Sequence, residues 1–194
     1  MYLKEPLFID FLKVKEILWV GINFSQAKFT RSGFDFTQEI MQHYFHEWNM
    51  LILNDQKKYD IRMSFRKPVM QYDLSVITKL NKSVKVSESL TKNIGTKDVF
   101  SDERMVKYLS GLSLPTTQPF ALTFVVESFD TSVKTAAIWV AVIKTTTKEV
   151  ILCEKFLKKP AGLGTRNYWA RTFYNVFFDI QSQSYMRWEN MVQP

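Results

Sequence analysis

Two hydrophobic periods predict a strand followed by a helix in the N-terminal part of the chain. Residues 17–24 alternate between two faces, as in a β-strand with at least one buried face. Residues 36–52 carry apolar side chains at spacings of three and four, the stripe of an amphipathic helix. Asp35 and Gln38 have the spacing of a capping box. We therefore expect the helix to begin near these two residues.

The C-terminal part predicts a sheet and a closing helix. Three β-rich runs at 120–129, 135–144 and 149–157 are separated by short polar turns, which is typical of an antiparallel meander. The middle run is apolar at both parities around Trp139, so both of its faces should be buried. Aromatic and aliphatic residues recur at helical spacing through 168–188, which predicts a long amphipathic helix.

The segment between these parts has a weaker pattern. Residues 69–80 fit a strand through alternate positions and also fit a helix, and the sequence leaves both interpretations open. Residues 82–118 begin with a stretch rich in Ser, Lys and Thr and are predicted to form an exposed excursion. Within it, 101–109 has the pattern of a short helix that Gly111 closes.

Composition supports a packed core in a single domain, 1–194. Hydrophobic residues make up 46% of the chain and aromatic residues 15%, more than an unfolded chain carries, and 194 residues can share one core. We predict an α+β fold. Its antiparallel sheet consists of the late three-stranded meander plus the N-terminal strand, and two long amphipathic helices pack against it.

Positive charge is spread along the chain. The formal net charge is +7 and the pI is about 9.4, yet no run of five basic residues occurs. Nucleic acid and anionic surfaces attract clustered charge, so spread charge favours the solvated faces of a soluble chain. Binding to nucleic acid or to an anionic surface stays open as an alternative.

Cysteine content and targeting signals leave the compartment open. Cys153 is the only cysteine, so no disulfide forms within the chain, and its apolar neighbours predict a buried hydrophobe rather than a nucleophile. Neither a signal-peptide core nor an apolar run of about 18 residues occurs, so no transmembrane segment is expected. A leader removed before Met1 would still be compatible with this sequence.

One group of potential metal ligands lies on the first predicted helix. Glu39, His43, His46 and Glu47 are spaced so that His43 lies within a turn of the other three. Closed transition-metal sites draw ligands from more than one element, and these two histidines are the only ones in the chain. We expect a polar helix face, with no functional metal and no cofactor.

A glycine-containing turn before the closing helix suggests an anion site. Gly162 and Gly164 could let backbone amides approach an anion at a helix start, with Lys158, Lys159 and Arg166 assisting. The third glycine of a dinucleotide fingerprint is missing, and no P-loop occurs. We therefore favour a tight turn with Gly164 at positive φ.

No catalytic set can be assembled from the sequence. Neither a Ser-His-Asp nor a Cys-His set can be nominated, because both histidines share one helix and the only cysteine lies in an apolar strand. Glu127 and Asp130 flank a strand end and are the remaining candidates, for carboxylate chemistry alone. We expect a protein that is not an enzyme.

The order of elements resembles that of small bacterial envelope α/β proteins. The residues that carry the resemblance are the strand–turn–strand segments 139–142 and 147–150 and the segment 162–169 that leads into the last helix. The resemblance implies a place in the bacterial cell envelope and brings no catalytic motif.

These observations favour a binding or assembly component with a protein partner, because a full core is present and convergent catalytic chemistry is absent. The alternative is a protein that binds nucleic acid or an anionic surface through its positive charge. A metalloenzyme that uses His43 and His46 ranks third.

Overall fold

The computed structural model describes residues 1–33 and 37–192. The strands are β1 (Tyr2–Leu3), β2 (Glu16–Asn23), β3 (Lys28–Thr30), β4 (Val69–Tyr72), β5 (Leu90–Thr91), β6 (Phe120–Asp130), β7 (Thr135–Lys144) and β8 (Glu149–Lys158). The helices are α1 (Glu5–Lys13), η1 (Arg31–Gly33), α2 (Gln38–Asn54), α3 (Ile61–Ser64), α4 (Ser75–Lys82), α5 (Val86–Ser89), η2 (Thr96–Asp98), α6 (Asp102–Ser110), α7 (Thr165–Asp179), η3 (Ile180–Ser184) and α8 (Tyr185–Asn190).

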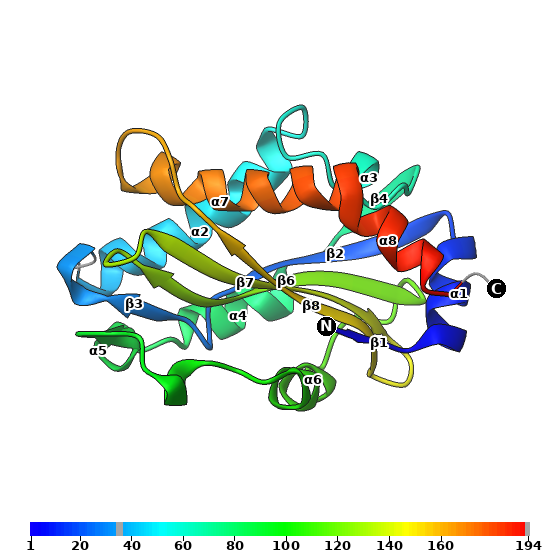
Figure 1. Ribbon diagram of the computed structural model, residues 1–194, viewed down its shortest axis with the longest axis horizontal. Helices are drawn as coiled ribbons and strands as arrows, with labels where there is room; N and C mark the ends of the chain where they lie inside the picture. The colour runs from blue at the N-terminus through cyan, green and yellow to red at the C-terminus, as the bar shows by residue number, and fades with distance from the viewer. Residues whose placement is uncertain (34–36, 193–194) are drawn as a thin grey trace.

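The fold is α+β, as predicted, but its eight-stranded sheet is mixed rather than antiparallel. The strand order is β1-β8-β7-β6-β2-β4, and β3 continues beside β6 with β5 on its outer side (Figure 1). The meander β6-β7-β8 is antiparallel, as predicted. The N-terminal strand β2 instead runs parallel to β6 and β4. Long connections containing helices return the chain to the same end of the sheet, which produces parallel neighbours.

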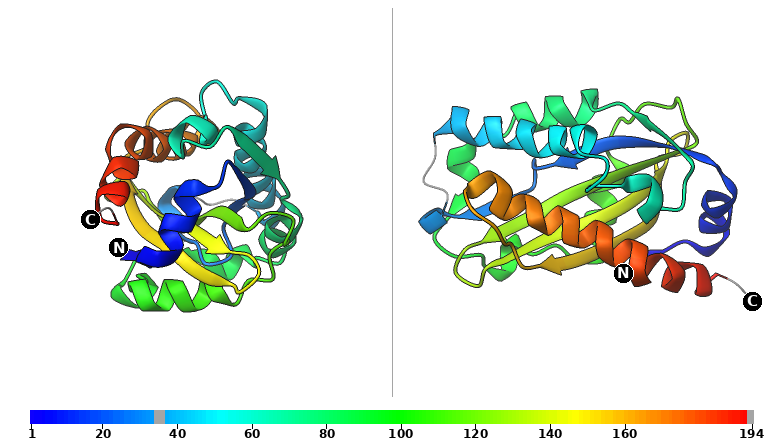
Figure 2. Two further views of the ribbon diagram at one scale, coloured as in Figure 1. Left: turned by 90° about the vertical axis from the view of Figure 1, so that its right-hand side faces the viewer. Right: turned by 90° about the horizontal axis from the view of Figure 1, so that it is seen from above.

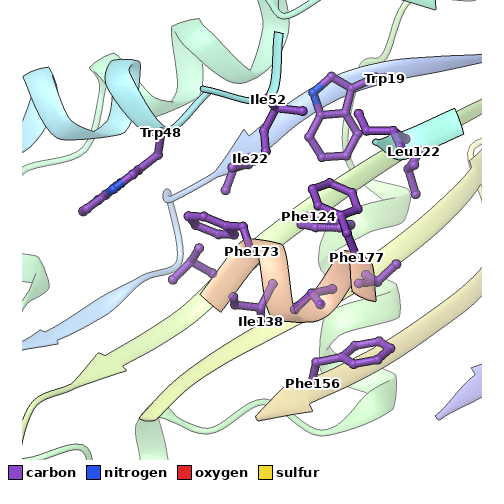
Figure 3. Packing of buried hydrophobic residues seen from close by; sticks show 14 of the residues in the cluster. Trp19, Ile22, Trp48, Ile52, Leu122, Phe124, Ile138, Phe156, Phe173 and Phe177 are labelled. Carbon is purple, nitrogen blue, oxygen red and sulfur yellow. The ribbon is translucent and has the colours of Figure 1, made fainter. Parts of the chain in front are cut away.

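Helices α2 and α7 cover one face of the sheet (Figures 1 and 2). Figure 3 shows Phe173 and Phe177 of α7 among side chains of the strands, including Phe124 and Ile138. The rings of Phe124 and Phe177 have centroids 4.9 Å apart. Burial of large aromatic side chains contributes most of the energy that holds helices on such a face.

The opposite face is covered by α4 and α6, and α6 lies within the segment 82–118 for which an exposed excursion with a short helix was predicted. Met105 and Leu109 of α6 are fully buried against the strand residues Trp139 and Val150. The prediction that both faces of β7 are buried is confirmed, because Trp139 is 1% exposed and Ile138 is 0% exposed.

The first predicted strand and helix are both present as β2 and α2. Asp35 of the predicted capping box lies outside the described residues. The Thr37 hydroxyl accepts the hydrogen bond from the Ile40 N–H and serves as the N-cap of α2. The Gln38 side chain instead holds the α4–α5 connection, donating to the Val84 carbonyl and accepting from the Val86 N–H.

The ambiguous stretch 69–80 contains both predicted structures in succession. Its first residues form strand β4 and its last residues belong to helix α4. The short helix closed by Gly111 is also present, as α6 with Ser101 as its N-cap. The hydrophobic period changes from that of a strand to that of a helix within a few residues, so the pattern did not fit a single element.

The closing helix is a continuous run of α7, the π-helical turn η3 and α8. Gly164 precedes α7 at φ +74°, which confirms its predicted positive φ. Only glycine adopts this region without a steric penalty from Cβ. This turn reverses the chain after β8, so that α7 packs across the sheet.

Two asparagine side chains take the place of a strand along the outer edge of β2. Strand β4 pairs with β2 only as far as Trp19. Beyond that point, Asn49 of α2 accepts from the Ile22 N–H (2.7 Å) and donates to the Ile22 carbonyl (3.0 Å). Asn81 of α4 donates to the same carbonyl and accepts from the Phe24 N–H. These bonds satisfy buried backbone groups that would otherwise be costly.

A buried lysine closes the C-terminal end of α1. The Lys67 side chain donates to the carbonyls of Phe11 (2.6 Å), Leu12 (3.1 Å) and Val14 (3.0 Å), and the residue is 2% exposed. Carbonyls at a helix C-terminus have no partner within the helix and carry partial negative charge, so a cation stabilises them. Burial lowers the pKa of Lys67 to about 8.

Candidate functional site

The residues of the predicted metal group lie along α2 without forming a cluster. Glu39, His43 and His46 are exposed on that helix. Glu47 forms an ion pair with Arg166, whose Nε lies 3.0 Å from a Glu47 carboxylate oxygen. Within residues 1–33 and 37–192, no three His, Cys, Asp or Glu side chains are placed to hold a metal ion.

The predicted anion site has two of its three cations engaged by carboxylates. Lys158 pairs with Asp179 of α7, and Arg166 pairs with Glu47 of α2. Lys159, Gly162 and Gly164 are exposed at the turn itself. Ion pairs already made reduce what these side chains can offer an anion. An anion site at this turn therefore stays a prediction.

The two carboxylates near the end of β6 have structural partners. Glu127 is 2% exposed, and its carboxylate accepts from the Trp139 indole N–H (2.8 Å), the Phe100 backbone N–H (3.0 Å) and the Lys155 ammonium (3.0 Å). Asp130 accepts from the Ser132 N–H within the turn that follows β6. Glu127 thus fastens the start of α6 to the meander.

Cys153 lies in the core between β8 and α6, where it is 0% exposed. Burial in apolar surroundings raises the pKa of its thiol, which keeps the sulfur protonated and weakly nucleophilic. The predicted role as a small buried hydrophobe agrees with this position.

The free edge of β8 is the feature that the structure adds to the sequence-based candidates. Strand β8 is ten residues long, but its outer neighbour β1 pairs only at Leu152 and Cys153. Residues 154–158 have no strand beside them on that side in the described part of the chain. Along an unpaired edge, alternate residues point backbone N–H and C=O groups outward, ready to pair with another strand.

A hollow of about 480 Å³ runs along this edge. One wall is formed by the edge residues of β8, and the other by Asp179, Gln183, Ser184 and Arg187 from the closing helix. Arg187 and the indole N–H of Trp188 both donate to Glu154, at 2.6 Å each. These bonds hold the helical wall at a fixed height above the strand.

The two sides of the β8 edge differ in polarity. Glu154 and Lys158 point to the side of the closing helix and form ion pairs there. On the opposite side, Leu157 is 65% exposed although it belongs to a strand. Lys155 shares that side, where it contacts Glu127. A neighbouring strand would therefore meet Glu154 and Lys158 on one side, and the exposed Leu157 next to the paired Lys155 on the other.

Sequence reasoning could not find this edge, because a strand pattern does not reveal which strands flank it. One signal was present: Glu154 and Lys155 lie in the last part of the third β-rich run, and Lys158 follows it directly. Charges within a strand are typical of an edge strand.

No helix in the described part of the chain is both long and apolar enough to cross a bilayer.

Comparison with known proteins gives little further information. No protein-family model matches the sequence, and no curated protein does so either. Among solved structures, the LpoB C-terminal domain from Salmonella enterica is similar, with 13% sequence identity, coverage of 80% of this chain and 94% of that one, and a TM-score of 0.27. A likeness of this size carries no argument about fold or function, so the envelope location remains an expectation.

Proposed function

We propose that the protein is a binding component that takes up an extended segment of a partner protein as an additional strand beside β8. The observation that carries the proposal is the unpaired edge at 154–158, next to a strand β1 that covers only two residues of β8. Natural proteins commonly cover or shorten such an edge, because it attracts other strands. Here the edge borders an open hollow instead.

The occupant is a peptide strand because the edge offers backbone groups rather than a closed pocket. Backbone hydrogen bonds supply affinity in strand addition, and side chains on alternate positions supply specificity. Charged groups on one side and the exposed Leu157 on the other favour a segment that alternates polar and apolar residues. An apolar side chain of the partner next to Leu157 would remove that leucine from water.

The experiment is an NMR titration with a short peptide that alternates threonine and valine. The sample is prepared without a purification tag before Met1, because a tag at that end could itself pair along β8 next to β1. We expect saturable shifts in the amides of 154–158 and slower hydrogen exchange there. A peptide of the same sequence with N-methylated backbone amides is the control, since it keeps the side chains and loses the backbone donors.

Two variants separate the edge from general hydrophobic adhesion. Leu157→Lys places a charge where the partner's apolar side chain would lie, and should weaken peptide binding about tenfold or more. Leu163→Lys makes the same change at a leucine that is 90% exposed in the turn after β8, and should leave binding unchanged. Equal binding of the N-methylated peptide, or equal losses in both variants, would contradict strand addition.

A further inference from the structure

A polar cleft lies where β2 gives way to β3. It has a volume of about 330 Å³ and is walled by the β2–β3 connection, α5 and the residues that lead into α6, which lie together at one end of the sheet (Figure 1). Clefts outside the carboxyl ends of parallel strands are common ligand sites, because the chain diverges there and leaves backbone and loop side chains facing solvent. The volume suits a small metabolite.

Hydrogen bonds next to this cleft connect the β2–β3 wall with α6. The Tyr108 hydroxyl lies 2.7 Å from the Asn23 side-chain nitrogen and 2.6 Å from the Ser25 hydroxyl. Asn23 also accepts from the Ser25 N–H. The break between β2 and β3 is thus tied to α6, which fixes the distance between two walls of the cleft. A site that is held by such bonds requires little ordering when a ligand binds.

The lining of the cleft carries an excess of positive charge. Its charged residues are Lys28, Lys85, Lys97, Arg104, Glu88 and Asp98. Lys85 forms an ion pair with Glu88 (3.2 Å), and Lys28 donates to the Glu88 backbone carbonyl rather than to its carboxylate. In the described part of the chain, no carboxylate lies within ion-pair distance of Lys28, Lys97 or Arg104. The cleft therefore has uncompensated cations from three separate segments.

Arg104 is the best placed of these cations. Its guanidinium lies over the Phe100 ring at 3.9 Å and donates to the Lys97 carbonyl at 3.1 Å. Four other arginines of the described chain, Arg62, Arg66, Arg166 and Arg187, each have a carboxylate partner. A guanidinium that is stacked on a ring keeps a fixed plane and presents its remaining N–H groups as a fork suited to phosphate or carboxylate oxygens.

Asp98 adds an acceptor to the same cleft. The residue is 9% exposed, and one carboxylate oxygen accepts from the Gly95 N–H. No basic side chain of the described chain lies within ion-pair distance of it. A carboxylate beside uncompensated cations would repel a simple anion, but it accepts hydrogen bonds from hydroxyl groups. A ligand that suits both the cations and the Asp98 carboxylate is a small molecule with an anionic group and hydroxyl groups.

We propose that this cleft binds the phosphate monoester of a small polyol, with the phosphate on Arg104, Lys97 and Lys28 and a hydroxyl on Asp98. Phosphate fits better than a carboxylate, because a tetrahedral dianion accepts donors from several directions, and the three cations come from three segments. The Ser25 hydroxyl in the lining can donate to the ligand while it accepts from the Tyr108 hydroxyl, and the Ser83 hydroxyl, which donates to the Leu80 carbonyl, can accept from a ligand hydroxyl. This site is separate from the β8 edge and does not depend on strand addition.

Calorimetry with glucose 6-phosphate, glucose and inorganic phosphate tests the proposal. We expect saturable binding of glucose 6-phosphate, weaker binding of phosphate and no binding of glucose. Arg104→Met should weaken binding of the ester about tenfold or more. Arg171→Met is the matched control, because Arg171 also stacks on a ring, that of Tyr174 at 4.4 Å, and lies outside the cleft lining.

A second pair of variants keeps the test valid if Arg104→Met fails to fold. Lys97→Met removes an exposed cation from the cleft and should weaken binding of the ester, while Asp98→Asn should reduce the advantage of the ester over inorganic phosphate. The proposal is overturned if glucose 6-phosphate does not bind, if it binds no more tightly than inorganic phosphate, or if Arg171→Met and Lys97→Met weaken binding equally.

Discussion

A Cβ atom on Gly21 would lie 2.7 Å from the side-chain oxygen of Asn49, which is the atom that accepts from the Ile22 N–H. Gly21 also adopts φ +111°, a region that residues with a Cβ rarely occupy. The hydrogen bond of Asn49 therefore depends on the glycine at position 21. The absence of a side chain on β2 makes room for the amide that replaces the missing strand.

Gly21→Ala should destabilise the protein by about 2 to 4 kcal/mol, because the substitution adds backbone strain and displaces a buried hydrogen bond. Urea unfolding measures the loss. Gly95→Ala is the control, since its Cβ would meet no atom closer than 3.5 Å and its φ is −100°. A loss for Gly21→Ala no larger than that for Gly95→Ala would show that the edge tolerates displacement of Asn49.

Glu127→Gln should cost about 3 kcal/mol in the free energy of unfolding. The carboxylate is buried, and its removal leaves the Lys155 ammonium, 2.9 Å away, without a counter-charge. The double variant Glu127→Gln/Lys155→Met should be more stable than Glu127→Gln alone, because no cation is then left unpaired. If the loss in the double variant equals the sum of the losses in Glu127→Gln and in the single variant Lys155→Met, the two side chains act independently.

Trp139→Ala should cost about 3 to 5 kcal/mol, through lost burial and the cavity left between β7 and α6. Trp139→Phe keeps most of the apolar contact and loses the indole N–H that Glu127 accepts, so its loss should be smaller. Guanidinium unfolding of the three proteins separates packing from hydrogen bonding. A loss below about 1 kcal/mol for Trp139→Ala would contradict cover by α6.

Lys67 should make the stability depend on pH above neutrality. Its pKa in the folded protein is about 8, below the ordinary value of 10.5, so between these values the unfolded chain holds a proton that the folded protein has released. Unfolding then takes up a proton, and the free energy of unfolding contributed by this group rises with pH, by up to about 3 kcal/mol. Below pH 8 the lysine is protonated in both states and adds no slope.

The measurement compares urea unfolding of the wild type and of Lys67→Met at pH 7, 8.5 and 10. Other groups titrate equally in both proteins, so the difference in stability isolates the lysine. We expect the wild type to gain stability relative to the variant as the pH rises through the window from 8 to 10.5. A difference that stays constant or shrinks would show that burial does not lower the pKa of this amine.

The long periodic elements were predictable because each is long enough for its apolar spacing to repeat. The stripe on α2 and the three runs of the meander pack against partners close by, and their local pattern records this. The parallel pairing of β2 with β6 was not predictable, because alternation in β2 is the same whichever direction its neighbour runs. Two-residue strands such as β1 and β5 are too short to show any period.

The candidate sites depended on spatial neighbours that no spacing in the sequence reveals. Glu47 and Arg166 were assigned to different predicted sites, and the structure joins them in one ion pair. Nothing in the sequence was a reason to select Arg104, because whether an arginine has a carboxylate partner depends on which elements pack around it. The buried Glu127 was identified as a candidate carboxylate, and its structural role follows from Lys155 on the strand two positions away in the sheet.

The parallel placement of β2 and β3 beside β6 also sets an order of events during synthesis. Thr30 and Thr131 form a hydrogen bond although they are 101 positions apart. The first strands therefore emerge from the ribosome long before their central partner exists, whereas β6, β7 and β8 follow one another and can pair as soon as they appear. Until β6 appears, β2 has only β4 and the N-terminal helices to contact, so we expect the chain to depend most on chaperones at this stage of synthesis.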